Sequence, residues 1–186
     1  MNLKLSSSGL KNASIAVTGS KSESNRLLIL QALYPNLTIT NVSNSDDTKV
    51  LQKALQQNQG IVDIHHAGTA MRFLTAYYAL KANTDVTLTG SKRMKERPMS
   101  ILVDALKELG AQITYKTNDG FPPLLIKGIT PEKTSVSLNA NVSSQYISAL
   151  MLVAASLNSG LDIQLKGRVT SVPYINMTLS LLNRVG

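Results

Sequence analysis

The sequence predicts an α/β domain of the inside-out type, in which apolar helices form the core and the sheets face solvent. Residues 147–157 are apolar on nearly every side, which is typical of a helix buried all round. The expected strands at 86–89 and 161–166 instead alternate apolar and polar residues. That alternation is typical of strands with one face on the core and one in water.

An internal repeat of about 75 residues indicates a pseudo-threefold arrangement. Three segments, beginning at residues 13, 84 and 161, read as an alternating strand, a glycine turn with a basic residue, and a helix. The turn glycines Gly19, Gly90 and Gly167 are 71 and 77 residues apart. Small hydroxylated residues also precede apolar helices at 65–80 and 140–157. We expect a closed pseudo-symmetric domain of repeated units.

Two further helices and one strand complete the expected elements. Helices are predicted at 46–57 and 99–109, the second followed by Gly110 as its C′ glycine. The segment "FPPLLIKG", from Phe121, reads as an extended strand entered through two prolines.

Composition restricts the function classes. The 186 residues suffice for one large domain or two small ones, and 43% hydrophobic with 16% charged residues is typical of a globular protein. A net charge of +8 favours anionic partners such as phosphorylated metabolites, nucleic acid or anionic membrane. Aromatic residues reach only 4%, which is few for stacking on single-stranded nucleic acid. The absence of Cys excludes disulfides, thiolate nucleophiles and Cys-ligated metals.

The sequence contains no segment that predicts export or a membrane span. Its first residues lack the apolar core of a signal peptide. The longest apolar stretch, 149–155, is too short to cross a bilayer. We expect a cytoplasmic protein that does not bind membranes.

Five expected helix starts carry small or basic residues. A helix N-terminus exposes unpaired N–H groups and a partial positive charge, and small residues there let an anion approach. Because the sequence repeats, we expect these starts to converge on one surface that binds two anionic groups, one of them a phosphate. The starts are Ser22 to Arg26, Gly68-Thr69, Arg97-Pro98, Ser143 to Gln145 and Ser171 to Tyr174, with Pro98 and Pro173 expected in first turns. The cations are Lys21, Arg26, Arg72 and Arg97.

Simpler interpretations stand beside this one. A serine before a helix often serves only as an N-cap. Asp46 and Asp47 are expected as cap and dipole partners rather than catalytic acids. His65 and His66, if they lie on a strand, point to opposite faces, so no metal pair is expected. The stretch "GSKS" lacks the second glycine of a nucleotide-binding P-loop. The recurrence of the pattern is what favours an anion site.

Six segments in order resemble the 5-enolpyruvylshikimate-3-phosphate synthase family, also called 3-phosphoshikimate 1-carboxyvinyltransferase. They are "GSKSESNRLLIL", "AGTAMRFL", "KERPM", "DGFPPLLIKG", "SSQYISALML" and "SVPYINMTLSLL". The resemblance implies an inside-out fold of βαβαββ units and covers about the first half of the family's length. Residues 1–12 would form a strand segment that pairs with a C-terminal domain. Residues 13–186 would form the substrate-binding domain, and the C-terminal domain itself is absent from this sequence.

The resemblance also implies a reaction and a set of residues. The family transfers the enolpyruvyl group of phosphoenolpyruvate to the 5-hydroxyl of shikimate 3-phosphate, without metal or organic cofactor. Shikimate 3-phosphate would be bound by Lys21, Ser22, Arg26, Ser143, Ser144, Gln145, Ser171 and Tyr174. Phosphoenolpyruvate, or the inhibitor glyphosate, would be bound by Lys21, Gly68, Thr69, Arg97 and Gln145, with Arg72 in support. The catalytic acid and base would belong to the C-terminal half, so we expect this chain to be inactive alone.

The sequence departs from the family at two positions near the expected phosphoenolpyruvate pocket. His66 replaces the usual Asn, and Phe73 replaces the usual Pro. Three alternatives stay open: the sister enzyme that acts on UDP-N-acetylglucosamine, a nucleic-acid-binding module that uses the net charge of +8, and a structural domain that binds no ligand. The sister enzyme usually carries a Cys that this chain lacks.

Overall fold

The structure is a computed structural model, and it describes residues 3–4, 6, 9, 12, 14–141 and 143–186. The described residues form both helices and strands, and none of these helices is long and apolar enough to cross a membrane. The elements are α1 (Lys21–Leu33), α2 (Asp46–Ala54), β1 (Gln59–Asp63), α3 (Gly68–Ala79), β2 (Asp85–Thr89), α4 (Lys92–Lys95), α5 (Ser100–Glu108), β3 (Gln112–Tyr115), β4 (Leu124–Lys127), β5 (Ser135–Asn139), α6 (Ser144–Ala154), β6 (Asp162–Lys166) and α7 (Val172–Val185).

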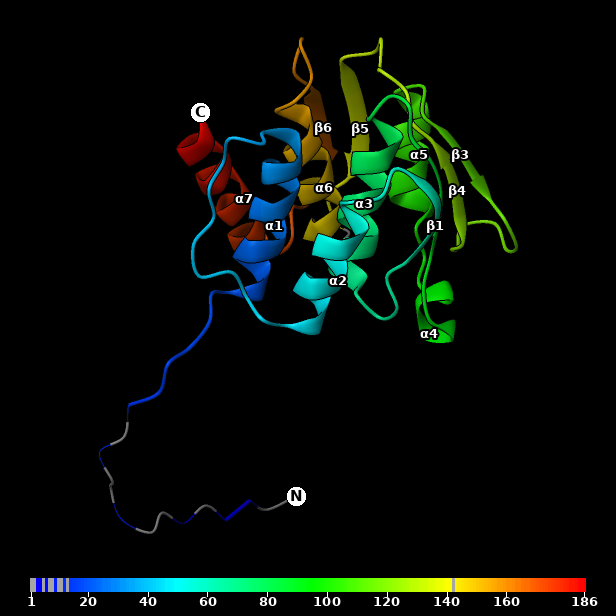
Figure 1. Cartoon of the computed structure of the whole chain (residues 1–186). Coiled ribbons are helices and arrows are strands. Elements are labelled where there is room, and N and C mark those ends of the chain that lie inside the picture. The colour runs from blue at the N-terminus through cyan, green and yellow to red at the C-terminus, as the bar shows by residue number, and fades with distance from the viewer. Residues whose placement is uncertain (1–2, 5, 7–8, 10–11, 13, 142) are drawn as a thin grey trace.

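The strands form two sheets. The larger sheet has the order β1-β2-β4-β3, with β1 parallel to β2 and with β4 antiparallel to both β2 and β3. The smaller sheet pairs β5 with β6 in parallel. In Figure 1, β3 and β4 lie at the right edge, α1 and α7 at the left, and α3 and α6 between them.

The helices form the core, as the sequence predicts. Every residue of α3 except Thr69 is buried, and α6 buries most of its length as well. The strands bury one side only: β2 buries Val86 and Leu88 and leaves the residues between them more exposed. Since apolar helices are enclosed while the strands keep one wet face, the inside-out arrangement is confirmed.

The internal repeat is visible in the backbone. Each parallel pair, β1 with β2 and β5 with β6, is separated by a buried helix and is extended by the same hydrogen bond beyond the strand ends. Ile64 N–H donates to Thr89 O at 3.0 Å, and Ala140 N–H donates to Lys166 O at 2.8 Å. The repeats expected from residues 84 and 161 are therefore confirmed.

The strand expected in the first repeat is not found among the described residues 14–18. Ile15 and Val17 are 81% and 79% exposed. A strand needs a neighbouring backbone for its N–H and C=O groups, and no described strand lies beside this segment. The expected strand segment at 1–12 lies mostly outside the described residues.

The remaining elements follow the prediction with small shifts. Helix α2 ends three residues before the expected position, α5 is one residue shorter at each end than the expected 99–109, and β4 forms after the two prolines. Pro98 is not in a first turn, because the N-cap of α5 is Met99. The Pro98 carbonyl instead accepts a hydrogen bond from Tyr146 Oη at 2.7 Å. Pro173 does lie in the first turn of α7.

Candidate functional site

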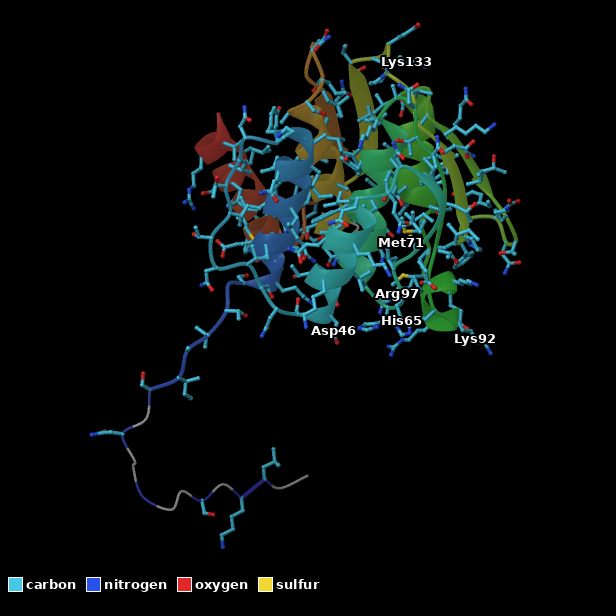
Figure 2. The ribbon with its side chains drawn as sticks, in the orientation of Figure 1. Asp46, His65, Met71, Lys92, Arg97 and Lys133 are labelled. Carbon is cyan, nitrogen blue, oxygen red and sulfur yellow. The ribbon has the colours of Figure 1, made fainter. Side chains whose placement is uncertain are left out.

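Four helices that carry expected site residues begin at one end of the domain. α1, α3 and α6 contact one another, and α7 packs on α1 and α6. In Figure 1, α1 and α7 both begin at the lower end. Figure 2 places Asp46, His65 and Arg97 at that end and Lys133 at the opposite end. The partial positive charges of several helix N-termini therefore gather on one surface.

The turn before α1 explains the opening of the "TGSKS" stretch. Gly19 N–H donates to Asn41 O at 3.0 Å, and a Cβ on Gly19 would lie 2.0 Å from that oxygen, so only glycine fits. Ser20 caps the helix, with its Oγ accepting from Glu23 N–H. The turn thus places an exposed Lys21 and a half-buried Ser22 in the first turn of α1.

Arg26 is held inside the domain by neutral groups from three helices. Its Nε–H donates to Thr178 Oγ1 at 2.7 Å, and Nη2 donates to Ser148 Oγ at 3.1 Å. Nη2 also reaches Tyr174 O at 3.4 Å, and Nη1 donates to Ser22 O at 2.9 Å. Arg26 is only 2% exposed. These bonds connect α1 to α6 and α7 and fix the plane of the guanidinium group.

No carboxylate neutralises Arg26 within the part of the chain that the structure describes. The ring of Phe73, on α3, lies against the guanidinium, with 5.4 Å between Arg26 Cζ and the ring centroid. Burial lowers the pKa of Arg26 below its usual value, since desolvation disfavours the charged form. A buried cation with only neutral partners is favourably placed to receive an anion.

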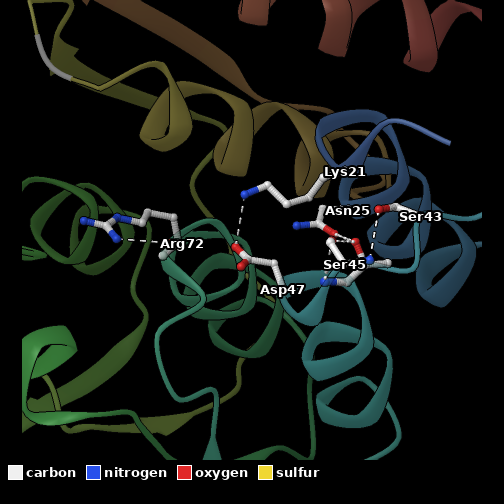
Figure 3. Close-up of polar contacts among 8 residues, drawn as sticks. Lys21, Asn25, Ser43, Ser45, Asp47 and Arg72 are labelled. Atoms are coloured by element: carbon white, nitrogen blue, oxygen red, sulfur yellow. Dashed lines mark hydrogen bonds and ion pairs between the residues drawn. The ribbon is translucent and has the colours of Figure 1, made fainter. Parts of the chain in front are cut away.

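Lys21 is paired with an acid from α2. Its Nζ lies 3.6 Å from Asp47 Oδ1, and the two side chains are 49% and 17% exposed. Figure 3 shows this pair beside the polar contacts between α1 and α2. Thr48 Oγ1 donates to Asn25 Oδ1 at 2.8 Å and is 2.9 Å from Ser45 Oγ. These contacts hold α2 so that Asp47 meets Lys21.

The expected roles of Asp46 and Asp47 are therefore only partly right. Both lie in the first turn of α2, where a negative charge suits the helix dipole, but the cap is Ser45. Asp47 has the further contact with Lys21, which sequence reasoning missed because it depends on how α2 packs against α1.

A second group of cations surrounds the start of α3. A Cβ on Gly68 would lie 2.5 Å from Arg97 Nη1 and 3.2 Å from Arg72 Nη1, so both guanidinium groups reach this backbone. Arg72 is 8% exposed, donates from Nη1 to Gly68 O at 3.0 Å, and lies over the Tyr146 ring. Its Nε is buried without a hydrogen-bond partner in the described structure. Thr69, next in the helix, is half-buried.

The starts of α6 and α7 contribute hydroxyl and amide groups. Ser143 is the exposed N-cap of α6 and accepts from Gln145 N–H at 3.3 Å, while Ser144 is buried and Gln145 half-buried. Ser171 precedes α7 with a left-handed φ of 55° and makes no side-chain cap bond. Tyr174 is 47% exposed. A non-glycine residue in this conformation is strained, a condition frequent at ligand sites.

The histidine pair does not lie on a strand, which corrects the sequence interpretation. β1 ends at Asp63, and the backbone of His65 turns to a φ of 50°. The two side chains therefore do not point to opposite faces: His65 Nδ1 lies 2.7 Å from His66 Nδ1. Across the described residues, no group of three or more His, Cys, Asp or Glu side chains is arranged to hold a metal ion.

Thr178 and Ser148 were not identified from the sequence as residues of the candidate site. Both are fully buried and both contact Arg26. Their sequence positions could have indicated this role, because each is a hydroxyl residue within a mainly apolar helix. A buried hydroxyl requires a hydrogen-bond partner.

The chain is similar in sequence to proteins of one enzyme family. Residues 52–186 match the family model described as EPSP synthase (3-phosphoshikimate 1-carboxyvinyltransferase). A 3-phosphoshikimate 1-carboxyvinyltransferase of Bacteroides fragilis strain YCH46 is 47% identical over 100% of this chain and 45% of its own length. The protein of that name from Shewanella pealeana is 38% identical over 94% of this chain and 47% of its own length.

The fold agrees with solved structures as well. An EPSP synthase structure from Acinetobacter baumannii superposes with a TM-score of 0.73 at 18% identity, over 92% of this chain and 43% of that one. The chain thus spans less than half the length of these relatives. Since the family model covers most of the chain, and since the fold is that of the solved enzyme, this chain belongs to the EPSP synthase family.

Proposed function

We propose that these residues form the substrate-binding half of a 3-phosphoshikimate 1-carboxyvinyltransferase. The full enzyme transfers the carboxyvinyl group of phosphoenolpyruvate to the 5-hydroxyl of shikimate 3-phosphate and releases phosphate. The chain supplies the shikimate 3-phosphate site and part of the phosphoenolpyruvate site, as the sequence motifs imply. The cytoplasmic location expected from the sequence stays a prediction.

One observation supports this proposal above the others: two buried guanidinium groups have no carboxylate partner among the described residues. Arg26 and Arg72 are 2% and 8% exposed, and the ion pair found in the described part of the chain involves Lys21 and Asp47 instead. A structural domain would gain little by burying unpaired cations, because their desolvation costs several kcal/mol. An anionic ligand that binds beside them offsets that cost.

The arrangement suits a reaction between two anions. Shikimate 3-phosphate would be held by the starts of α1, α6 and α7, and phosphoenolpyruvate by the start of α3 with Arg97. Lys21 and Gln145 would contact both substrates. Cations and helix N-termini then offset the mutual repulsion of the substrates and hold the hydroxyl oxygen close to the carbon that it attacks.

The chemistry itself needs groups from a second domain. The 5-hydroxyl loses its proton to a base as its oxygen bonds to C2 of phosphoenolpyruvate, and C3 gains a proton from an acid; then the C2–O bond to phosphate breaks, C3 loses a proton and phosphate leaves. These steps need an acid and a base. We assign both to the rest of the longer protein, as the length of the relatives suggests. Residues 1–12 would pair with that second domain and 13–186 would form the substrate-binding domain.

The proposal is tested by calorimetric titration of the purified chain with shikimate 3-phosphate at fixed salt. Lys21→Ala removes one charge-assisted contact and should weaken binding about ten- to a hundredfold. Lys133→Ala makes the same charge change at the opposite end of the domain and should leave binding unchanged.

Three outcomes would count against the proposal. Equal losses in the two lysine variants would indicate non-specific charge attraction. Binding of RNA with steep salt dependence, without binding of shikimate 3-phosphate, would favour the nucleic-acid alternative. Turnover by the chain alone, abolished by Lys21→Ala, would refute the assignment of the acid and base to a second domain.

A further inference from the structure

Among the described residues, the ring of Phe73 lies against Arg26, the most buried cation of the expected site. Phe73 is 1% exposed, and its ring centroid lies 5.4 Å from Arg26 Cζ. The family resemblance implies that Phe73, which replaces the usual Pro, lies near the phosphoenolpyruvate pocket. The structure places its ring against Arg26, which belongs to the shikimate 3-phosphate set.

The other contacts of Arg26 leave part of its hydrogen-bonding capacity unused. Four hydrogen bonds run from the guanidinium to Thr178, Ser148, Tyr174 O and Ser22 O. A guanidinium has five N–H donors, so at least one has no acceptor in the described structure. The acceptor of the Nη1 bond is the main-chain oxygen of Ser22, a residue of the first turn of α1 that belongs to the expected shikimate 3-phosphate set.

An aromatic face differs from an acceptor in one respect that matters here. It stabilises a cation through its quadrupole and occupies no N–H donor. A carboxylate in the same place would neutralise Arg26 and bind two of its donors. Phe73 therefore stabilises a desolvated guanidinium while leaving it positively charged and able to donate.

We propose that Phe73 is a positioning residue that sets the affinity of the Arg26 site for a phosphorylated or carboxylated ligand by holding the guanidinium plane through its ring face. The inference rests on the proposed function for the identity of that ligand. If the cation–π contact between Phe73 and Arg26 is weakened, the guanidinium is free to rotate. An anion then binds without an N–H donor already oriented toward it, so its affinity falls.

The test changes the electrostatics of the ring with little change in its size. The chain contains two phenylalanines, Phe73 and Phe121, so biosynthetic incorporation of trifluorophenylalanine reports on one of them when the other is replaced. In Phe121→Leu, fluorination reaches residue 73 alone. In Phe73→Leu, it reaches residue 121 alone and is the matched control. Fluorine withdraws electron density from the ring and weakens a cation–π contact, which a purely structural packing role would not sense.

Calorimetric titrations use two probes, shikimate 3-phosphate and inorganic phosphate. Fluorination at residue 73 should weaken the binding of both about three- to thirtyfold and should lower the melting temperature by a few degrees at most, because only one contact of the core is weakened. Fluorination at residue 121 should change neither affinity. Equal or tighter binding after fluorination at residue 73 overturns the inference.

The two probes separate this inference from the proposed function. A chain that binds inorganic phosphate with the fluorine dependence, but does not bind shikimate 3-phosphate, contradicts the proposed function and supports the role of Phe73. A chain that binds shikimate 3-phosphate without the fluorine dependence supports the proposed function and contradicts the role of Phe73. A folded chain that binds neither anion overturns both.

Discussion

Replacing Gly68 by Ala tests how closely the guanidinium groups approach the start of α3. The new Cβ would lie 2.5 Å from Arg97 Nη1 and 3.2 Å from Arg72 Nη1. Ordinary contacts begin near 3.4 Å, so the Arg97 guanidinium must move by about 1 Å. Loss of a charge-assisted hydrogen bond from a displaced guanidinium costs about 1.5–3 kcal/mol, which is about ten- to a hundredfold in affinity. We therefore expect phosphoenolpyruvate to bind about ten- to a hundredfold more weakly.

The fold should tolerate this change. The atoms that the new Cβ meets are the ends of flexible side chains, and Gly68 is in a helix, where alanine is favoured over glycine by about 0.5–1 kcal/mol. Gly128→Ala is the contrasting variant, since its Cβ would lie 1.8 Å from the backbone oxygen of Lys81. That oxygen cannot move aside, so we expect a loss of about 1–3 kcal/mol in the free energy of unfolding.

The assay is a titration with phosphoenolpyruvate at saturating shikimate 3-phosphate, together with thermal unfolding of each variant. If displacement of Arg97 is the cause, the double variant Gly68→Ala with Arg97→Ala should bind no more weakly than Arg97→Ala alone. Unchanged affinity in Gly68→Ala, or a fully additive loss in the double variant, would show that displacement of Arg97 does not weaken phosphoenolpyruvate binding.

Three further predictions concern stability. Thr178→Val leaves Arg26 Nε–H buried without its acceptor and should lower the free energy of unfolding in urea by about 1–3 kcal/mol. Thr178→Ser keeps the hydroxyl and should retain most of that stability. An equal loss in both variants would argue against the hydrogen bond. Burial, with two nearby aspartates, raises the pKa of Tyr115 to about 12. Because the folded state holds that proton more tightly, its stability contribution is complete below pH of about 10 and is lost as the pH rises through about 12. Alkaline unfolding should show this dependence, and Tyr115→Phe should remove it; a variant with the same profile contradicts the assignment. Asp47→Asn should change the free energy of unfolding by less than about 1 kcal/mol, because its partner Lys21 is half-exposed, and a larger loss in denaturant titration would show that the pair is structural.

The sequence predicted those features of the fold and the site that depend on local residue patterns. Apolar residues on nearly every side of 147–157 identified a buried helix, and the small residues Gly68, Ser143 and Ser171 identified the starts of α3, α6 and α7. The internal repeat then indicated that these starts share one surface. Each of these features depends on residues close together in the chain, where spacing alone carries the information.

What could not be predicted depends on packing between distant segments. The strand expected before Gly19 has no described neighbour, although its residues alternate as a strand would. Asp47 reaches Lys21 only because Asn25 and Thr48 join α1 to α2. Phe73 contacts Arg26 because α1 packs against α3. Contacts of this kind are fixed by tertiary packing, which spacing along the chain does not specify.

If the starts of α1, α6 and α7 form one anion site, backbone amide NMR of the chain titrated with shikimate 3-phosphate should show it. We expect saturable shifts confined to residues 20–26, 143–145 and 171–174, with the amides near Lys133 unchanged. Saturable shifts that leave these three segments unaffected, or a response spread evenly over the basic surface, would contradict it.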